Sequence, residues 1–278
     1  MQLKKVGIKN FRGIEQKEII FKSGFNLIQG ANGTGKTSVL EAIAVGLGGF
    51  IAGLSDVATR HFTVDEIRNV YMKTGDGSYN KMNVMPLEVL IEAVLEGEEF
   101  QWIRGKSSIN ASRSTTQPRD ICKKAEKMTE DKNAEFPILL YLSAGRVWSQ
   151  KREKNIDIFR KQYFRMIGYT DALIDASNIK LLLNWCMKME MVAWQKEKKI
   201  AEYEAVKQAV AKFMDIMDES KGHEIFYDKQ EEQLMYKIED KILPITQLSA
   251  GYQSLVWMAF DIAYRMAVLN PDKKEHIT

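Results

Sequence analysis

A glycine-rich segment near the N-terminus constrains this chain more than any other feature. Residues 30–37 have the sequence GANGTGKT, which fits the spacing G-x-x-x-x-G-K-[ST] of a phosphate-binding loop. Glycines at these positions let the backbone approach an anion closely and turn its N–H groups inward. The apolar run Phe25–Ile28 precedes the loop, and residues 39–47 carry apolar side chains at helical spacing. The sequence therefore predicts a strand, an anion-binding turn and a helix in succession.

Several residues of this loop are candidate ligands of a nucleotide. We expect Lys36 to place its charge on the β- and γ-phosphates and Thr37 to offer its hydroxyl to Mg²⁺. The helix that begins near Lys36 adds the positive end of its dipole. The chain has no N-K-x-D segment to read guanine, which favours ATP. The expected contacts to ATP and Mg²⁺ in this loop are Gly30, Asn32, Gly33, Gly35, Lys36, Thr37 and Ser38.

Composition sets broad limits on the class of protein. The chain has 278 residues, 45% hydrophobic and 28% charged, so it can bury a substantial core in one large or two small domains. Its net charge of +3 is too small to indicate a nucleic-acid partner. Cys122 and Cys186 lack metal-ligand spacing, so we expect no zinc site. No signal peptide or long apolar stretch is found, and we expect a cytoplasmic protein without a membrane partner.

Periodicity predicts the other elements. Residues 2–9 alternate between apolar and polar and predict a strand. Strands are also expected at 14–21, 87–95, 99–104, 224–227 and 233–237, and a buried, strongly apolar strand at 136–142. Helical spacing predicts helices at residues 64–72, 119–128, 178–217 and 249–269, with a surface loop at 106–118. Glycines at 46, 48 and 49 are expected to weaken the helix after the phosphate loop. The charged stretch 196–204 is expected to be a solvated face, and a lid that contacts a partner is the alternative.

A second motif, LSAGYQSL, occupies residues 248–255. By itself it predicts the start of a helix, with Ser249 as N-cap and Gly251 in the first turn. Together with the phosphate loop, it resembles the LSGGQ signature of ABC-type ATPases in the form used by the SMC and RecF branch. In those proteins the signature serine and its helix N-terminus bind the γ-phosphate of an ATP held by the other subunit. Ala250 and Tyr252 depart from the signature.

The resemblance implies a set of residues that act together across a dimer. Ser249, Gly251 and Gln253 would contact an ATP bound to the partner's phosphate loop. Lys36, Thr37 and Ser249 would be the residues that act in catalysis.

The N-terminal segments support the same branch. The patterns L-x-x-V-x-I-x-N-F-R-G at residues 3–13 and G-x-N-G-x-G-K-T-S-x-L-E-A-I at residues 30–43 resemble RecF, SMC and OLD-family heads. In those proteins the loop after the first strand lies beside the nucleotide. Arg12 is therefore a candidate nucleotide contact, and a surface arginine in a turn is the equally open alternative.

A narrower resemblance is to bacterial RecF-type ATPases of anti-phage defence systems, such as the Septu ATPase and retron-associated ATPases. It rests on Y-x-x-x-G-R-x-W at residues 141–148, Gly168-Tyr169, Trp185 and the segment 248–271. The resemblance implies a partner nuclease or toxin, with DNA as another possible partner.

One expected part of the site is not found. In such proteins a strand ending in Asp-Glu follows the signature helix; its Asp holds Mg²⁺ through water and its Glu activates the attacking water. The chain ends at Thr278, where we expect that strand, the Walker B strand, to begin. The pair Asp218-Glu219 ends a polar helical run, and the strand at 87–95 carries no terminal acid pair. Truncation, a separate polypeptide, or ATP binding without turnover would each account for this.

These observations predict an α/β fold of the ABC/RecF head type, with a mixed sheet, an N-terminal antiparallel β subdomain and a helical insertion. We expect an N-terminal ATPase lobe at residues 1–175, a lid-like insertion at 176–220 and a C-terminal lobe at 221–278. The leading hypothesis is an ATPase that dimerises around ATP and controls a nuclease or toxin or engages DNA. The alternatives are an ATP-gated scaffold that does not hydrolyse ATP and, less favoured, a small-molecule kinase.

Overall fold

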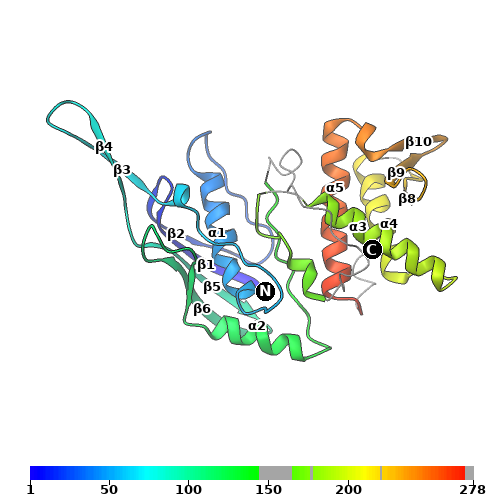
Figure 1. Cartoon of the computed structure of the whole chain (residues 1–278), viewed down its shortest axis with the longest axis horizontal. Coiled ribbons are helices and arrows are strands. Elements are labelled where there is room, and N and C mark those ends of the chain that lie inside the picture. The colour runs from blue at the N-terminus through cyan, green and yellow to red at the C-terminus, as the bar shows by residue number, and fades with distance from the viewer. Residues whose placement is uncertain (144–164, 176–177, 220, 273–278) are drawn as a thin grey trace. The chain divides into compact units, whose positions relative to one another are not determined.

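A computed structural model describes residues 1–143, 165–175, 178–219 and 221–272 (Figure 1). The chain divides into two compact units, Met1–Tyr141 and Leu142–Thr278. The predicted division into three parts at residues 175 and 220 remains a prediction. Of the residues that carry the defence-type resemblance, Gly145, Arg146 and Trp148 lie outside the described residues.

A five-stranded sheet forms the base of the first unit. Its order is β2-β1-β5-β6-β7, and each neighbouring pair is antiparallel. The strands are β1 (Gln2–Phe11), β2 (Ile14–Ile20), β5 (Leu87–Leu95), β6 (Glu98–Lys106) and β7 (Thr115–Gln117). The strands expected at residues 2–9, 14–21, 87–95 and 99–104 are thus confirmed, and β7 lies within the expected surface loop at 106–118.

Two helices, α1 (Lys36–Ile51) and α2 (Asp120–Glu130), pack on this sheet. Along β5 every second residue from Leu87 to Leu95 is buried, which is the period-two pattern of a half-buried strand. Helix α1 continues through its three glycines to Ile51, and their expected weakening of the helix stays a prediction. These glycines let the helix approach the sheet closely, because a Cβ on Gly46 would lie 2.6 Å from Cδ1 of Ile91. The Trp102 indole donates a 2.8 Å hydrogen bond to the Gly46 carbonyl.

The expected helix at residues 64–72 is wrong. A single 3-10 turn, η1 (Val64–Glu66), is followed by a two-stranded hairpin of β3 (Asn69–Lys73) and β4 (Tyr79–Asn83) that extends away from the sheet (Figure 1). Glu66 closes the turn by accepting a 3.0 Å hydrogen bond from the Thr63 N–H. Gly77, at φ +84°, supplies the left-handed conformation that the hairpin turn requires.

Two predicted strands do not form. Phe25–Ile28 has no strand structure, since the Asn26 side chain bonds backbone groups of Lys22 and Gly24 and organises a turn that competes with pairing. Residues 136–142 also have no strand structure. Pro137 in that segment has no N–H group to donate to a ladder.

The second unit combines helices with a small antiparallel sheet. Its 3-10 turns are η2 (Arg165–Tyr169) and η3 (Ile245–Gln247), and its helices are α3 (Ile179–Gln195), α4 (Ala201–Met217) and α5 (Ala250–Leu269). The three strands, in the order β10-β9-β8, are β8 (Glu224–Asp228), β9 (Gln233–Ile238) and β10 (Lys241–Pro244). The single helix expected at 178–217 is therefore two helices, with Glu197 at φ +48° in the break between them.

The second unit has an aromatic core. Trp185 of α3 makes edge-to-face contacts with the rings of Tyr203, Phe260 and Tyr264, at centroid distances of 5.5, 6.4 and 5.1 Å. This tryptophan therefore packs the core of the second unit. Helix α5 also carries a buried ion pair, in which Nε of Arg265 donates to Asp261 at 2.8 Å. The other end of that guanidinium donates to the carbonyls of Gly168 and Thr170.

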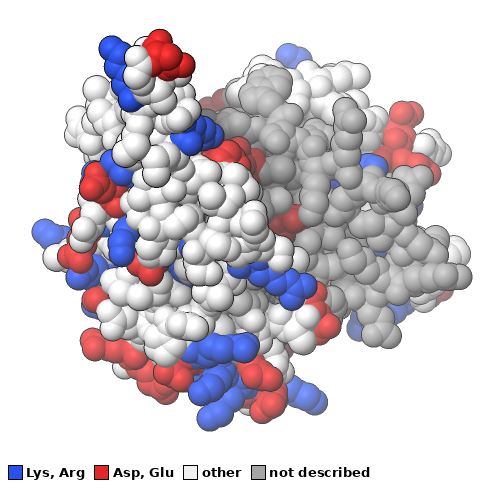
Figure 2. Space-filling model, turned by 60° about the vertical axis from the view of Figure 1, so that its left-hand side comes forward, with Lys and Arg blue, Asp and Glu red and all other residues white. Residues whose placement is uncertain are grey.

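The α/β class and the N-terminal antiparallel β subdomain are confirmed. Every ladder between described strands is antiparallel, so the parallel pairs of a mixed sheet are not found among the described residues. Figure 2 shows basic and acidic side chains interspersed over the visible face of the first unit. Among the described helices, none combines the length and apolar character needed to cross a bilayer.

Candidate functional site

The phosphate loop lies on the surface of the first unit, immediately before α1. Gly33 and Gly35 have φ values of +83° and +87°, a region that disfavours residues with a Cβ. A Cβ on Gly30 would lie 2.8 Å from Oγ1 of Thr34. The spacing of glycines in the sequence is therefore required by the backbone path of the loop.

The N-terminus of α1 is open to an anion. Its N-cap is Gly35, which has no side chain to accept from the first turn, and no acidic side chain lies in that turn. The N–H groups of the first helical residues have no acceptor within the helix. Thr37 is exposed and Ser38 half-buried at this end. These donors and the helix dipole suit a bound phosphate.

Lys36 folds back over the loop. Its ammonium donates hydrogen bonds of 2.8 Å to the Gly30 carbonyl and 2.7 Å to the Ala31 carbonyl. The Thr34 hydroxyl also donates to the Ala31 carbonyl, at 2.8 Å. The charge of Lys36 is thus held within the loop, beside the first turn of α1. Lys36, Thr37 and the loop glycines are brought together as the sequence predicted, and the residues present fit the phosphates of ATP and a magnesium ion.

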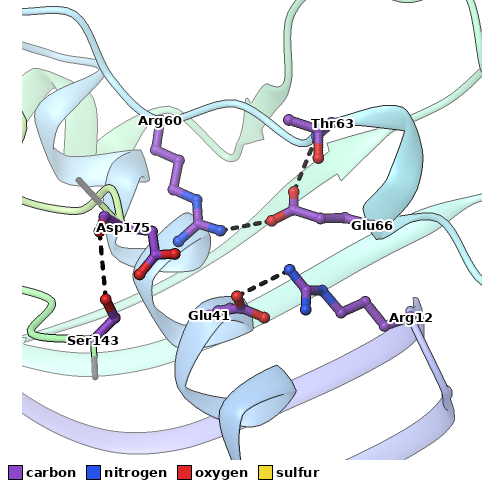
Figure 3. A network of polar contacts seen from close by, with 7 residues as sticks. All are labelled: Arg12, Glu41, Arg60, Thr63, Glu66, Ser143 and Asp175. Carbon is purple, nitrogen blue, oxygen red and sulfur yellow. Dashed lines mark hydrogen bonds and ion pairs between the residues drawn. The ribbon is translucent and has the colours of Figure 1, made fainter. Parts of the chain in front are cut away.

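Arg12 lies in the turn between β1 and β2 and is bound to α1. Its guanidinium donates a 2.9 Å hydrogen bond to Glu41, whose side chain is 8% exposed (Figure 3). A second pair joins Arg60 to Glu66 at 2.6 Å, and the Arg12 N–H donates to the Glu66 carbonyl. Arg12 is therefore part of an ion-pair network in the first unit. Its expected contact with the nucleotide stays a prediction.

The signature segment begins α5 in the second unit. Ser249 is the N-cap of the helix, and its hydroxyl accepts from the Tyr252 N–H at 3.4 Å. Ser249, Ala250 and Gly251 are exposed, and a Cβ on Gly251 would meet no atom within 4 Å. This exposed helix end can also receive an anion, although the Ser249 hydroxyl already caps one of its N–H groups.

Two other residues of the signature are engaged with the protein. The Gln253 amide donates to the carbonyls of Thr246 and Leu248, at 2.9 and 2.7 Å, and so fixes the turn that precedes α5. The Tyr252 hydroxyl donates to Asp218. Asp218 follows α4 and Glu219 has φ +52°, so this acid pair does not end a strand.

A family profile described as "AAA domain" matches residues 5–247, which is most of the chain. The chain belongs to the AAA domain family. The matched span includes the phosphate loop and ends just before Ser249. Helix α5 therefore follows the matched span.

The fold is that of an SMC head. A solved structure described as "Crystal structure of the SmcHead bound to the C-winged helix domain of ScpA" superposes with a TM-score of 0.52 at 16% identity, covering 98% of this chain and 78% of that chain. This chain is also similar to the DNA replication and repair protein RecF of Salmonella arizonae and of Salmonella typhi. Each of these two proteins is 56% identical to this chain over 43 residues. That alignment covers 16% of this chain and spans 12% of the length of those relatives.

Proposed function

We propose that this chain binds ATP and Mg²⁺ at the phosphate loop and dimerises around the nucleotide. The observation that carries the proposal is the exposed start of α1, where Gly35 leaves the first-turn N–H groups open and Lys36 lies across the loop. The exposed, Ser249-capped start of α5 supports a second phosphate contact. In a dimer, Ser249, Gly251 and Gln253 of one subunit would meet the γ-phosphate held by the other.

The experiment measures the mass of the full chain by light scattering, with and without ATP and Mg²⁺. The proposal predicts a dimer only with nucleotide. Ser249→Arg should abolish it, because a long side chain blocks the interface, and should leave ATP binding by the separate subunit intact. A small-molecule kinase would show no dimer that depends on ATP and Ser249. A chain that stays monomeric at saturating ATP would contradict the proposal.

We also propose that the chain hydrolyses the ATP that it binds. Membership of the AAA domain family supports hydrolysis. A scaffold that uses ATP only as a switch is the second candidate, and it is favoured by the placement of Asp218 and Glu219 away from a strand end. Measured phosphate release that is lost in Lys36→Ala would identify an ATPase. Dimerisation without release would identify the scaffold.

The partner is proposed from resemblance. The curated relatives are DNA replication and repair proteins, which supports DNA as a partner. The resemblance of residues 141–148 and 248–271 to anti-phage defence ATPases supports a nuclease or toxin. Co-purification of the tagged chain from its native host separates these partners: the defence role requires a nuclease or toxin in the complex.

A further inference from the structure

A polar hollow lies in the first unit, at the end of α1 that is opposite the phosphate loop. It has a volume of about 840 Å³ and is bounded by the residues after α1, the loop 55–61, the start of α2 and strand β7 with the loop before it. Because α1 has 16 residues, its two ends are roughly 24 Å apart. The hollow is therefore separate from the loop that holds Lys36.

The lining of this hollow is basic. It includes Arg104, Arg113, Arg119 and His61, with Asp56 as its one carboxylate. Asp56 accepts a 3.1 Å hydrogen bond from the Ser55 hydroxyl. No ion pair joins it to an arginine of the lining within the described part of the chain.

Arg104 is the buried member of this set, with 1% of its surface exposed. Its guanidinium donates to Oγ1 of Thr116 at 2.8 Å and to the Arg60 carbonyl at 2.7 Å, and it has longer contacts with Ser114 and His61. These acceptors are all neutral, and its Nε has no hydrogen-bond partner. Burial lowers the pKa of Arg104 to about 10, so it stays charged at neutral pH. A buried charge with no counter-ion among the described residues is costly unless an anion compensates it.

The other basic groups add to this charge. Arg113 and Arg119 are exposed, and neither has an ion pair among the described residues. Nδ1 of His61 accepts the Ser114 N–H at 3.0 Å, which leaves Nε2 as the donor of the neutral ring. Burial, and then the charges of Arg104 and Arg113, lower the pKa of His61 and keep it neutral at pH 7.

Two of the carbonyls at the end of α1 accept hydrogen bonds from side chains, which partly offsets the negative end of the helix dipole. The Gly48 carbonyl accepts from the Thr59 hydroxyl at 2.6 Å, and the Gly49 carbonyl accepts from the Cys122 thiol at 3.3 Å. A purely structural role for Arg104, as a link between the loop at Arg60 and strand β7, accounts for its hydrogen bonds. It does not account for two further arginines facing the same hollow.

We propose that this hollow binds a phosphate-bearing ligand of nucleotide size, held by the guanidinium groups of Arg104, Arg113 and Arg119. Arginine forks match phosphate oxygens in two-point hydrogen bonds. The volume lies within the range of small-molecule sites. The phosphate would come from a free nucleotide or from the end of a polynucleotide, which share this chemistry.

The test uses the full chain with Lys36→Ala, so that the phosphate loop does not contribute. Pyrophosphate, AMP and a 5′-phosphorylated oligonucleotide are titrated separately by calorimetry. We expect one site per chain for at least one of these probes. Arg113→Ala and Arg119→Ala should each weaken that binding by about tenfold, since each removes a charge-assisted hydrogen bond. Both side chains are exposed, so neither change disturbs the core.

Lys123→Ala is the matched control, because Lys123 is an exposed cation of α2 that lies outside the lining. The affinity of the Lys123→Ala variant for the probes should equal that of the chain without this change. Binding of AMP or pyrophosphate alone would indicate a free nucleotide, and binding that requires the oligonucleotide would indicate a polynucleotide end. No binding of any probe, or equal loss in Lys123→Ala and Arg113→Ala, would overturn the proposal.

Discussion

The guanidinium of Arg12 donates a 2.9 Å hydrogen bond to Glu41, which ties the turn after β1 to the second turn of α1. Glu41 is buried, whereas the Arg12 side chain is 36% exposed. The pair therefore fixes the orientation of the helix whose first residue is Lys36.

Removal of this arginine should reduce stability. Arg12→Ala removes the charge-assisted hydrogen bond to the buried Glu41 carboxylate and should lower the free energy of unfolding by about 1–3 kcal/mol. Urea denaturation measures the change, with the exposed Lys17→Ala as control, which should lie within about 0.5 kcal/mol of the parent chain. ATP titration of the same variant tests the nucleotide contact: an unchanged affinity would leave Arg12 with a structural role alone.

Close packing of α1 on the sheet gives a second prediction, in which two effects have opposite signs. Gly46→Ala gains about 1 kcal/mol of helix propensity. Its Cβ would, however, lie 2.6 Å from Cδ1 of Ile91 and 2.9 Å from Cγ1 of Val89, both fully buried. Overpacking costs about 1–3 kcal/mol. We expect a lower melting temperature, whereas Gly251→Ala, on a helix with open space, should not lower it. A rise in melting temperature for Gly46→Ala would contradict this packing.

Much of the fold follows from local patterns, and the errors have local causes. Strict alternation at residues 87–95 identifies β5, since each face of a half-buried strand has one environment. The apolar residues at 64–72 also fit helical spacing, but the capping contacts between Thr63 and Glu66 stabilise only a single turn. The turn signal at 74–78, with Gly75 and Gly77, could have identified the hairpin. The break between α3 and α4 has no glycine or proline to announce it.

Loss of the buried Asp261 carboxylate in the second unit should lower the free energy of unfolding more than Arg12→Ala does. Asp261→Ala leaves Arg265, which is 1% exposed, without its ion-pair partner. Breaking a buried pair in this way costs about 3–5 kcal/mol. Urea denaturation measures the loss, and Lys123→Ala, which breaks an exposed pair with Asp120, should cost less than about 0.5 kcal/mol. Equal effects of the two variants would contradict a structural role for the buried pair.

The candidate site was only partly readable from the sequence. The phosphate loop is a contiguous motif whose glycine spacing reflects its backbone path. The Arg12–Glu41 pair and the basic hollow around Arg104 join residues far apart in the chain, and no local pattern reports such pairs. The sequence predicts Gln253 as a ligand; its amide donates to the carbonyls that precede α5, and its contact with a nucleotide stays a prediction. A sequence motif identifies the residues of a site. It does not tell which of them contact the ligand and which hold the loop in its conformation.

The role of Ser249 as a cap can be separated from its proposed role as a phosphate contact. Ser249→Asp and Ser249→Asn both keep a side-chain acceptor for the Tyr252 N–H, so both should retain the stability of α5. The aspartate adds a negative charge where a γ-phosphate would lie. We expect light scattering to show ATP-dependent dimers for Ser249→Asn and none for Ser249→Asp. Equal dimerisation of the two variants would remove Ser249 from the interface.

The central claim is that the phosphate loop holds ATP through Lys36 and the open start of α1. Isothermal titration of ATP with Mg²⁺ into the full chain tests it most directly, in parallel with Lys36→Ala. We expect saturable binding by the parent chain and no measurable binding of ATP at this loop by the variant, because the ammonium is the one side-chain charge that the loop provides. Equal ATP affinity of the two chains would contradict the claim.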